Sequence, residues 1–312
     1  MRIALTGPTG AIGSDTIRLA ISKGYEVIAI VRPGTDRLGN LPKSDKIRII
    51  ESDISDYDKI DISEKCDIFI HLAWMNTFGN QRDDVYTQTA NIQYSLDAVR
   101  LAHKWGSTSF IGVGSQAEYG IKNEKLNSST PIDPQSGYGI AKYAAGKLCK
   151  ILCEQLGMRF NWARILSTYG VYDAEHTLIM YLINTLLDGN IPELTKCEQK
   201  WDYIYSKDVA TALLSIGSRG KNGKTYCVGS GECRELKDYV IELKNIVNPG
   251  SEIRFGARPY YAHQPMMLSA DISELREDTG FVPAYTFSKG IQEILDHIKT
   301  SRKRDRSNTG LK

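Results

Sequence analysis

Short apolar runs rich in valine, isoleucine and alanine alternate with longer amphipathic segments through the first half of the chain. The apolar runs predict strands buried on both faces, and the amphipathic segments predict helices that bury one stripe of side chains. Repeated strand and crossover helix is typical of an α/β fold with a doubly wound parallel sheet. The predicted strands read RIALTG, EVIAIV, KIRIIE, DIFIHLA, SFIGVGS and FNWARIL, and the predicted helices cover residues 14–23, 84–105, 138–156 and 177–188.

The alternation loosens after FNWARIL into segments punctuated by proline and glycine, which predicts a domain boundary near residue 170. We expect one domain over residues 1–170 and a smaller α/β domain over residues 171–300. Some segments of residues 171–300 can pack back into the first domain. Residues 301–312 read SRKRDRSNTGLK and are polar and basic, so we expect a flexible, solvated tail.

Composition narrows the class of protein. Hydrophobic residues make up 41% and charged residues 24% of the 312, which fits a folded globular protein and excludes a disordered one. A formal net charge of +2 supplies no large field for nucleic acid or a membrane surface, so we expect neither partner. No apolar run approaches the roughly 20 residues of a membrane span, and the amino terminus lacks a signal-peptide pattern, which predicts a cytoplasmic protein.

Cysteine and histidine spacing argues against a metal site. The 6 cysteines include no CxxC pair, and Cys149 and Cys153 lie on one predicted helix at a spacing that suits a buried apolar face. The 5 histidines are scattered, without metal-ligand spacing. We therefore expect reduced, structural thiols and no bound metal.

The turn TGPTGAIG follows the first predicted strand and opens the first predicted helix. Its three glycines lie where only a residue without Cβ lets the backbone and the helix approach a pyrophosphate, at the positive end of the helix dipole. A tight structural turn is the alternative, but a strand before and a helix after favour a dinucleotide site. The expected cofactor contacts in this turn are Gly7, Thr9, Gly10, Ala11, Ile12 and Gly13.

The residue after the second strand bears on which dinucleotide binds. About twenty residues past the glycines this fold usually places an acid on the adenosine ribose, and Arg32 stands there instead. A guanidinium can pair with a ribose 2′-phosphate through two parallel hydrogen bonds, whereas an acid would repel that phosphate. We therefore predict NADP, with Arg37 as a second contact. NAD is the alternative, with Arg32 on a solvated loop.

Tyr138 and Lys142, in YGIAK, lie four residues apart on a predicted helix, so their side chains share a face. We expect the ammonium to lower the pKa of the phenol from its reference value near 10, which would make Tyr138 a general acid or base. The spacing alone is not specific, because Tyr143 and Lys147, among others, repeat it. Position distinguishes Tyr138, since its helix follows the strand that ends at Ser115, and ligands of open α/β sheets lie at the carboxyl ends of strands.

Together, the glycine turn, a serine at a strand end and YxxxK resemble the extended short-chain dehydrogenase/reductase family, in its branch of nucleotide-sugar epimerases, dehydratases and reductases. The resemblance covers most of the chain through IIESDIS, HLA, Asn91, RILSTYG and WDYIYSKDVA, in the family's order. It implies a Rossmann-type dinucleotide-binding domain over residues 1–170, a substrate-binding region over residues 171–300 and a nucleotide-diphosphate sugar as substrate. It also implies a homodimer formed through the helices near 84–105 and 138–156.

The resemblance further implies roles for single residues. Ser115 hydrogen-bonds the substrate carbonyl or hydroxyl, Tyr138 passes the proton, and Lys142 also grips the nicotinamide ribose. Two of the substrate contacts given below have a purely structural alternative: Trp74 can fill the core, and Arg258 can form an ion pair. Beside the glycine turn and Arg32, the implied cofactor contacts are Asp53, Ile54, Leu72, Ala73, Tyr138 and Lys142. The implied substrate contacts are Trp74, Ser115, Gln116, Tyr138 and Arg258.

The residues after Ser115 narrow the reaction. By the resemblance, the family's dehydratases carry an Asp-Glu pair there, because removal of water needs an acid for the departing hydroxyl and a base for the adjacent proton. Here Gln116 and Ala117 occupy those places, which disfavours dehydration. We expect Glu118 to brace the loop, with a direct catalytic role as the alternative. No histidine lies near Ser115 in the sequence, which argues against an acyl nucleophile.

The remaining chemistry is hydride transfer at a sugar carbon. We expect an NADPH-dependent reductase of a nucleotide-linked 4-keto-6-deoxyhexose with Tyr138 as general acid, because reductive enzymes usually draw on NADPH. The family's epimerases usually carry NAD with an acid at the position of Arg32, so a 4-epimerase with tightly bound NAD is the alternative. A non-catalytic NADP-sensing protein is a weaker alternative, because such relatives typically lose the tyrosine or the lysine.

Overall fold

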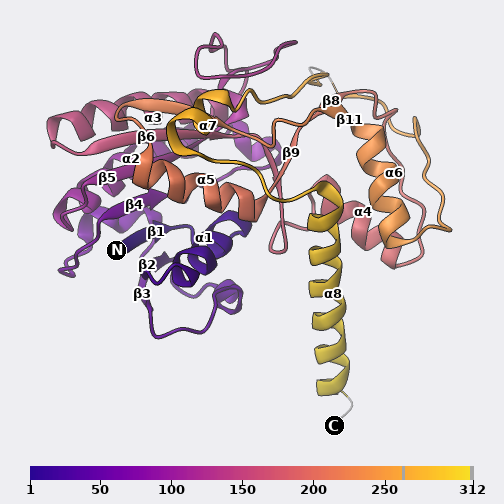
Figure 1. Ribbon diagram of the computed structural model, residues 1–312, viewed down its shortest axis with the longest axis horizontal. Helices are drawn as coiled ribbons and strands as arrows, with labels where there is room; N and C mark the ends of the chain where they lie inside the picture. Colours follow the sequence, from indigo (N-terminus) through magenta and orange to yellow (C-terminus); the bar gives the residue numbers. More distant parts are fainter. Residues whose placement is uncertain (262–263, 310–312) are drawn as a thin grey trace.

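The computed structural model describes residues 1–261 and 264–309 of the chain. Within them, seven parallel strands form the central sheet (Figure 1). The strand order reverses between β1 and β4, which confirms the doubly wound α/β fold. In spatial order the strands are β10 (Lys224–Val228), β6 (Arg159–Ile165), β5 (Ser109–Ser115), β4 (Ile68–His71), β1 (Arg2–Thr6), β2 (Glu26–Val31) and β3 (Ile47–Glu51).

Helices cover both faces of this sheet. On one face α1 (Ala11–Ser22) packs against α5 (Ser206–Arg219), and on the other α2 (Val85–Lys104) packs against α3 (Gly137–Gln155). Each face therefore has its own apolar cluster, and successive residues of a strand alternate between the two. In β1 the side chains of Ile3 and Leu5 enter the first cluster and Ala4 enters the second, all fully buried.

The predicted apolar face of α3 is confirmed by its cysteines. Cys149 and Cys153 are fully buried in the second cluster and carry free thiols. Among the described residues, no group of three or more histidine, cysteine, aspartate or glutamate side chains is placed to hold a metal ion.

The segments after β6 build a second region with its own core. Its helices lie beside one another at one side of the molecule (Figure 1), around a cluster that includes Ile183, Leu243 and Ile291. Among the described residues, two small two-stranded sheets lie outside the central sheet. The helices are α4 (Leu178–Leu187), α6 (Leu236–Val247) and α8 (Phe287–Thr309), and the small sheets pair β7 (Ser167–Tyr169) with β9 (Tyr203–Tyr205) and β8 (Lys200–Trp201) with β11 (Arg234–Glu235).

Three elements return from the later part of the chain to the first domain. Helix α5 packs on α1, strand β10 extends the central sheet beside β6, and α7 (Ser273–Thr279) packs on both α5 and β10. The second core therefore begins near the predicted boundary, but no single cut in the chain separates the two regions. Over residues 1–261 and 264–309, four 3-10 helices lie in connecting segments: η1 (Asp36–Asn40), η2 (Ile54–Lys59), η3 (Gly79–Asp83) and η4 (Gln116–Glu118).

Helix α8 continues through Thr309, so it includes most of the segment expected as a tail over residues 301–312. Residues 310–312 lie outside the described residues, and the flexibility of this segment stays a prediction. In the described part of the chain, no helix combines the length and the apolarity that a membrane crossing requires.

His71 holds together the point where the strand order reverses. It ends β4, is 2% exposed, and its Nδ1 lies 2.9 Å from Thr6 Oγ1 at the end of β1 while Nε2 lies 3.3 Å from Ser95 Oγ on α2. Thr6 Oγ1 accepts the backbone N–H groups of Leu72 and Ala73 at 3.1 and 3.2 Å. Burial lowers the pKa of His71 to about 3, so the ring is neutral and links two strands and a helix through hydroxyl groups.

This burial predicts an acid-sensitive fold. The pKa of His71 falls from 6.5 to about 3 on folding, so between these values the unfolded chain binds one more proton than the folded chain. The free energy of unfolding should therefore decrease by about 1.4 kcal/mol per unit as the pH falls through this window, from this group alone. Urea unfolding at pH values near 7 and 5 measures it. His71→Gln should be less stable near neutral pH but show a smaller loss on acidification, and an identical loss in both proteins would contradict the assignment.

Candidate active site

Two adjoining cavities of about 500 and 480 Å³ lie over the carboxyl ends of the central strands. Ser115, Tyr138 and Lys142 line the first, and Arg32 and Asp53 line the second. The cavities share walls and form one groove, as expected where the strand order reverses. The residues common to both are Gly7, Gly10, Leu72, Trp74 and Thr77, and the other predicted cofactor residues divide between them: Ala11, Ile12 and Gly13 in the first, Thr9, Ile54 and Ala73 in the second.

The glycine turn fits a pyrophosphate. Gly7 has φ +66°, and a Cβ there would come within 3.0 Å of Ala73 N, whereas a Cβ on Gly13 would collide with the carbonyl of Gly7. Gly10 is different, because a Cβ there would meet no protein atom closer than 3.9 Å, so its open side faces the groove. Helix α1 begins after Gly10 without a side-chain cap or an acidic residue in its first turn, which leaves free N–H groups and a positive dipole for an anion.

At the other end of the groove, the predicted adenosine contacts line the second cavity together. Arg32 is exposed, and Asp53 caps η2 by accepting the N–H and the hydroxyl of Ser55 at 3.1 and 3.0 Å. Arg37 lines the same cavity but donates its guanidinium to the carbonyl of Tyr172 at 2.9 Å. Both arginines therefore line this cavity, but only the Arg37 guanidinium is held by the Tyr172 carbonyl.

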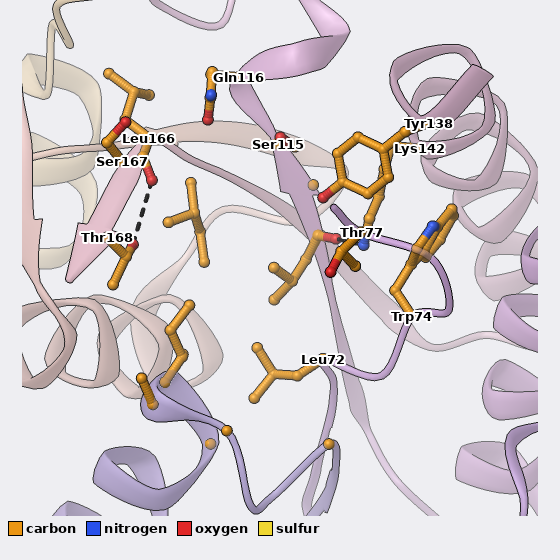
Figure 2. A pocket seen from close by; sticks show the side chains of 18 of the residues that line it. Leu72, Trp74, Thr77, Ser115, Gln116, Tyr138, Lys142, Leu166, Ser167 and Thr168 are labelled. Atoms are coloured by element: carbon orange, nitrogen blue, oxygen red, sulfur yellow. Dashed lines mark hydrogen bonds between the residues drawn. The ribbon is translucent and has the colours of Figure 1, made fainter. Parts of the chain in front are cut away.

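The predicted catalytic residues meet in the first cavity. Figure 2 shows Tyr138 and Lys142 projecting from α3 beside Ser115, with Trp74 next to them. Lys142 is 3% exposed, donates its Nζ to the carbonyl of Val113 at 2.7 Å and lies 3.8 Å from the centre of the Trp74 ring. Burial lowers the pKa of Lys142 to about 7.

The expected effect of Lys142 on Tyr138 is not what the structure shows. Burial of the phenol raises the pKa of Tyr138 above its ordinary value. A hydrogen bond with Ser115 and the charge of Arg82 reduce this rise but do not cancel it. The four-residue spacing predicted the ammonium beside the phenol, but Nζ lies 5.9 Å from the centre of the Tyr138 ring and is engaged by the Val113 carbonyl and the Trp74 ring. The guanidinium carbon of Arg82 lies closer to the centre of the Tyr138 ring, at 4.7 Å, than Nζ of Lys142 does, at 5.9 Å.

Glu118 braces the loop, as the sequence predicted. Its side chain is fully buried and its Oε1 accepts the N–H of Ser115 at 2.9 Å. The same carboxylate accepts Nε1 of Trp162 at 3.0 Å and Nε of Arg164 at 2.7 Å. Its lone pairs are therefore committed to donors on β5 and β6, and it lines neither cavity of the groove.

Trp74 lines both cavities because α2 holds its loop in place. Its Nε1 donates to Gln88 Oε1 at 2.9 Å, and Gln88 Nε2 donates to the carbonyl of Asn76 at 2.8 Å. Asn91 accepts the N–H of Met75 and donates to the carbonyl of Met75, both at 3.0 Å. The motif asparagine therefore acts on the backbone of this loop, and Trp74 is a wall of the groove as well as a packed side chain.

The groove continues into the second region through two smaller cavities of about 330 and 380 Å³. Ser167, Thr168, Asp173 and Thr177 line both the catalytic cavity and the nearer of the two. Arg258 lines the farther one, where its guanidinium carbon lies 5.9 Å from the centre of the Tyr181 ring. The structure therefore separates Arg258 from Gln116, which lines the catalytic cavity with Ser115, although one chain of cavities connects them.

Several cavity residues carried no signal in the sequence. Arg82 and Thr77 follow β4, and the rule that strand ends carry function identifies this loop but not which of its side chains turns inward. Asp173 follows β7, and burial raises the pKa of its carboxyl. Leu166 also lines the cavity, directly after β6.

Comparison with known proteins adds independent findings. The model of the NAD dependent epimerase/dehydratase family matches residues 3–229. A dTDP-glucose 4,6-dehydratase of Mycolicibacterium smegmatis is 25% identical (96% of this chain, 94% of that protein), and a CDP-abequose synthase of Salmonella muenchen is 27% identical (94% and 97%). A solved UDP-N-acetylglucosamine 4-epimerase of Methanobrevibacter ruminantium has a TM-score of 0.87 at 22% identity, over 96% of this chain and 98% of that one. These matches confirm the resemblance and the fold.

The buried carboxylate of Glu118 makes a testable contribution to stability. Glu118→Gln keeps the size of the side chain but leaves the Arg164 guanidinium buried without its counter-charge, so we expect a loss of about 3 kcal/mol in the free energy of unfolding. Urea denaturation measures it. The control is Glu154→Gln, which breaks the exposed pair with Lys150 and should change stability by less than about 1 kcal/mol. Equal, small losses in the two variants would contradict the bracing role.

Proposed function

The chain belongs to the NAD dependent epimerase/dehydratase family, and on that premise we propose that it is an NADPH-dependent reductase of a nucleotide-linked 4-keto-6-deoxyhexose. One observation carries the proposal: Ser115, Tyr138 and Lys142 line a single cavity that continues the groove of the glycine turn. The connected cavities beyond it supply room for a second nucleotide. Each similar protein reported above is named for a nucleotide-linked sugar, which is dTDP-, CDP- or UDP-linked, and this supports the substrate class.

The side chains divide the work of carbonyl reduction. The nicotinamide, when bound, supplies the hydride to the carbonyl carbon. Tyr138 as general acid donates its phenolic proton to the carbonyl oxygen, so that no free alkoxide accumulates, and the hydroxyl of Ser115 holds that oxygen by a hydrogen bond. Lys142, buried one helical turn beyond Tyr138, is placed to hold the nicotinamide ribose, as the resemblance implies.

The wall around Ser115 supports reduction over dehydration. Gln116 lines the cavity where a dehydratase would carry an acid, and Ala117 has no proton to move. The next carboxylate, Glu118, is committed to three donors and does not line the cavity. The carboxylate that does line the cavity, Asp173, comes from the opposite wall, after β7.

A 4-epimerase that retains NAD is the second candidate, and one observation favours it. Tyr172 accepts a hydrogen bond from Arg18 on its hydroxyl at 2.7 Å and from Arg37 on its carbonyl at 2.9 Å. These bonds tie the segment after β7 to α1 and to the segment after β2, across the walls of the groove. Such a tie would slow exchange of a dinucleotide, which suits an enzyme that returns the hydride to the other face of the same sugar.

Cofactor choice, partners and location complete the proposal. Exposed Arg32 at the adenosine end supports NADP, and Arg258 in the farther cavity supports a contact with the substrate diphosphate. We propose a cytoplasmic homodimer formed through α2 and α3. Large apolar side chains exposed on these two helices support the dimer: Val85, Tyr86, Ile140, Leu148 and Ile151.

Cofactor consumption tests the reaction. Purified protein with NADPH and a set of GDP-, dTDP-, CDP- and UDP-linked 4-keto-6-deoxy sugars should oxidise NADPH stoichiometrically with one of them, followed by nicotinamide absorbance and product analysis. Tyr138→Phe should bind NADPH normally and lose turnover by about 10²-fold or more, because the phenolic proton is gone. Interconversion of plain nucleotide hexoses without net NADPH loss would establish the epimerase instead. Unchanged turnover in Tyr138→Phe would refute the acid assignment.

Cofactor preference tests Arg32. A charge-assisted contact with the 2′-phosphate contributes about 1.5–3 kcal/mol, so Arg32→Ala should weaken NADPH binding about tenfold or more and leave NADH binding unchanged. Calorimetric titration of both dinucleotides measures it. Arg37→Ala is the matched comparison and should cost less, because the Arg37 guanidinium already donates to Tyr172. Equal affinity of the wild type for NADPH and NADH would overturn the assignment.

A further inference from the structure

We propose that Arg82 is a positioning residue for Tyr138, whose guanidinium lies over the tyrosine ring, fixes its orientation and favours its phenolate form. The inference deepens the proposed function and rests on it in one respect: it takes Tyr138 as the group that transfers the proton. Neither the sequence nor the resemblance assigns a role to Arg82.

The first observation is the contact itself. The guanidinium carbon of Arg82 lies 4.7 Å from the centre of the Tyr138 ring, within the range of a cation–π interaction. Nε of Arg82 is buried and has no hydrogen-bond partner among the described residues. A buried N–H without an acceptor is costly, so this placement needs a compensating interaction, and the face of the Tyr138 ring supplies one.

The second observation is how the segment of Arg82 is attached. The neighbouring Asp83 accepts the backbone N–H of Gly137, the first residue of α3, at 2.7 Å. A carboxylate at a helix amino terminus is favoured by the helix dipole. A Cβ on Gly137 would lie 3.1 Å from the carbonyl oxygen of Arg82 and 3.4 Å from Cα of Asp83, so glycine allows this close approach. This hydrogen bond therefore attaches η3, which carries Arg82, to Gly137, the residue directly before Tyr138 in α3.

The third observation concerns the other charged and titratable groups around the ring. Within α3, Nζ of Lys142 lies 5.9 Å from the ring centre, farther than the guanidinium of Arg82. From η4, the charge of Glu118 opposes ionisation of the phenol, and from β5 the hydroxyl of Ser115 favours it by a hydrogen bond. Beyond Tyr138, Arg82 also acts on Tyr261, which lies in the segment that follows α6.

The two cations near Tyr138 differ in how they respond to pH. Burial lowers the pKa of Lys142 to about 7, so near neutral pH a large fraction of this side chain carries no charge. A guanidinium stays protonated throughout the working range. Arg82 therefore supplies a constant positive charge at the ring, whereas the charge of Lys142 varies with pH.

The test measures the ionisation of residue 138 directly. A fluorotyrosine placed at position 138 reports its own titration by fluorine NMR and separates it from the other 16 of the 17 tyrosines. Arg82→Gln should raise the pKa of this residue by about one unit, because one nearby opposite charge is lost. Arg82→Lys keeps a charge but not the planar contact, so it should shift the pKa in the same direction by less. It also keeps the test available if Arg82→Gln does not fold.

A matched control separates this contact from a general change of charge. Arg276 is exposed on α7, away from the groove, and Arg276→Gln should leave the titration of residue 138 unchanged. No shift in Arg82→Gln, or the same shift in Arg276→Gln, overturns the proposal. The pH profile of turnover in Arg82→Gln should move by the same amount as the NMR titration. The titration needs no substrate, so absent reductase turnover would count against the proposed function and not against this inference.

Discussion

The structure depends on the reversal of strand order between β1 and β4. Because the chain leaves β1 toward β2 and returns at β4 on the other side, the connections after these neighbouring strands diverge and leave their carboxyl ends uncovered. Thr6 pairs with His71 in the parallel sheet, so β1 and β4 end at the same level, and the two side chains are hydrogen-bonded to each other. The glycine turn follows one strand and the loop of Trp74 follows the other, so this one constraint of topology places both walls of the groove.

Buried polar side chains shape the loops that this crevice needs. His71, Asn91 and Glu118 are each almost wholly buried, which would cost several kcal/mol if their polar atoms had no partners. Each instead makes a hydrogen bond at the site: His71 with the hydroxyl of Thr6, Asn91 with the N–H of Met75 and Glu118 with the N–H of Ser115. The hydrogen bonds of His71 and Asn91 join residues 65 and 16 apart in the sequence, and Glu118 also bonds Trp162 and Arg164 on β6. The loops therefore become rigid only once the sheet and α2 have assembled.

Electrostatics at the centre of the site follow from the same burial. Lys142 is buried and Tyr138 is half-buried, which disfavours the charged form of both and so lowers the pKa of Lys142 and raises the pKa of Tyr138. An ammonium in this position cannot by itself offset the burial of the phenol, because a carbonyl and an indole ring engage it. Arg82 enters from outside α3, and its more weakly hydrated guanidinium tolerates partial burial over an aromatic ring better than a second ammonium would.

The sequence by itself determined the features that depend on local pattern. Apolar runs identified each strand from β1 to β6, and helical periodicity identified α1 to α4 within a few residues. The glycine turn, Ser115, Tyr138 and Lys142 were predicted to share one site, and they line one groove because strand-end geometry brings them together. Tertiary structure alone decided the rest. The return of α5 and β10 to the sheet, the direction of Lys142 and the entry of Arg82 and Asp173 into the cavity depend on contacts between distant segments. No periodicity records such contacts, since they exist only after the chain has packed.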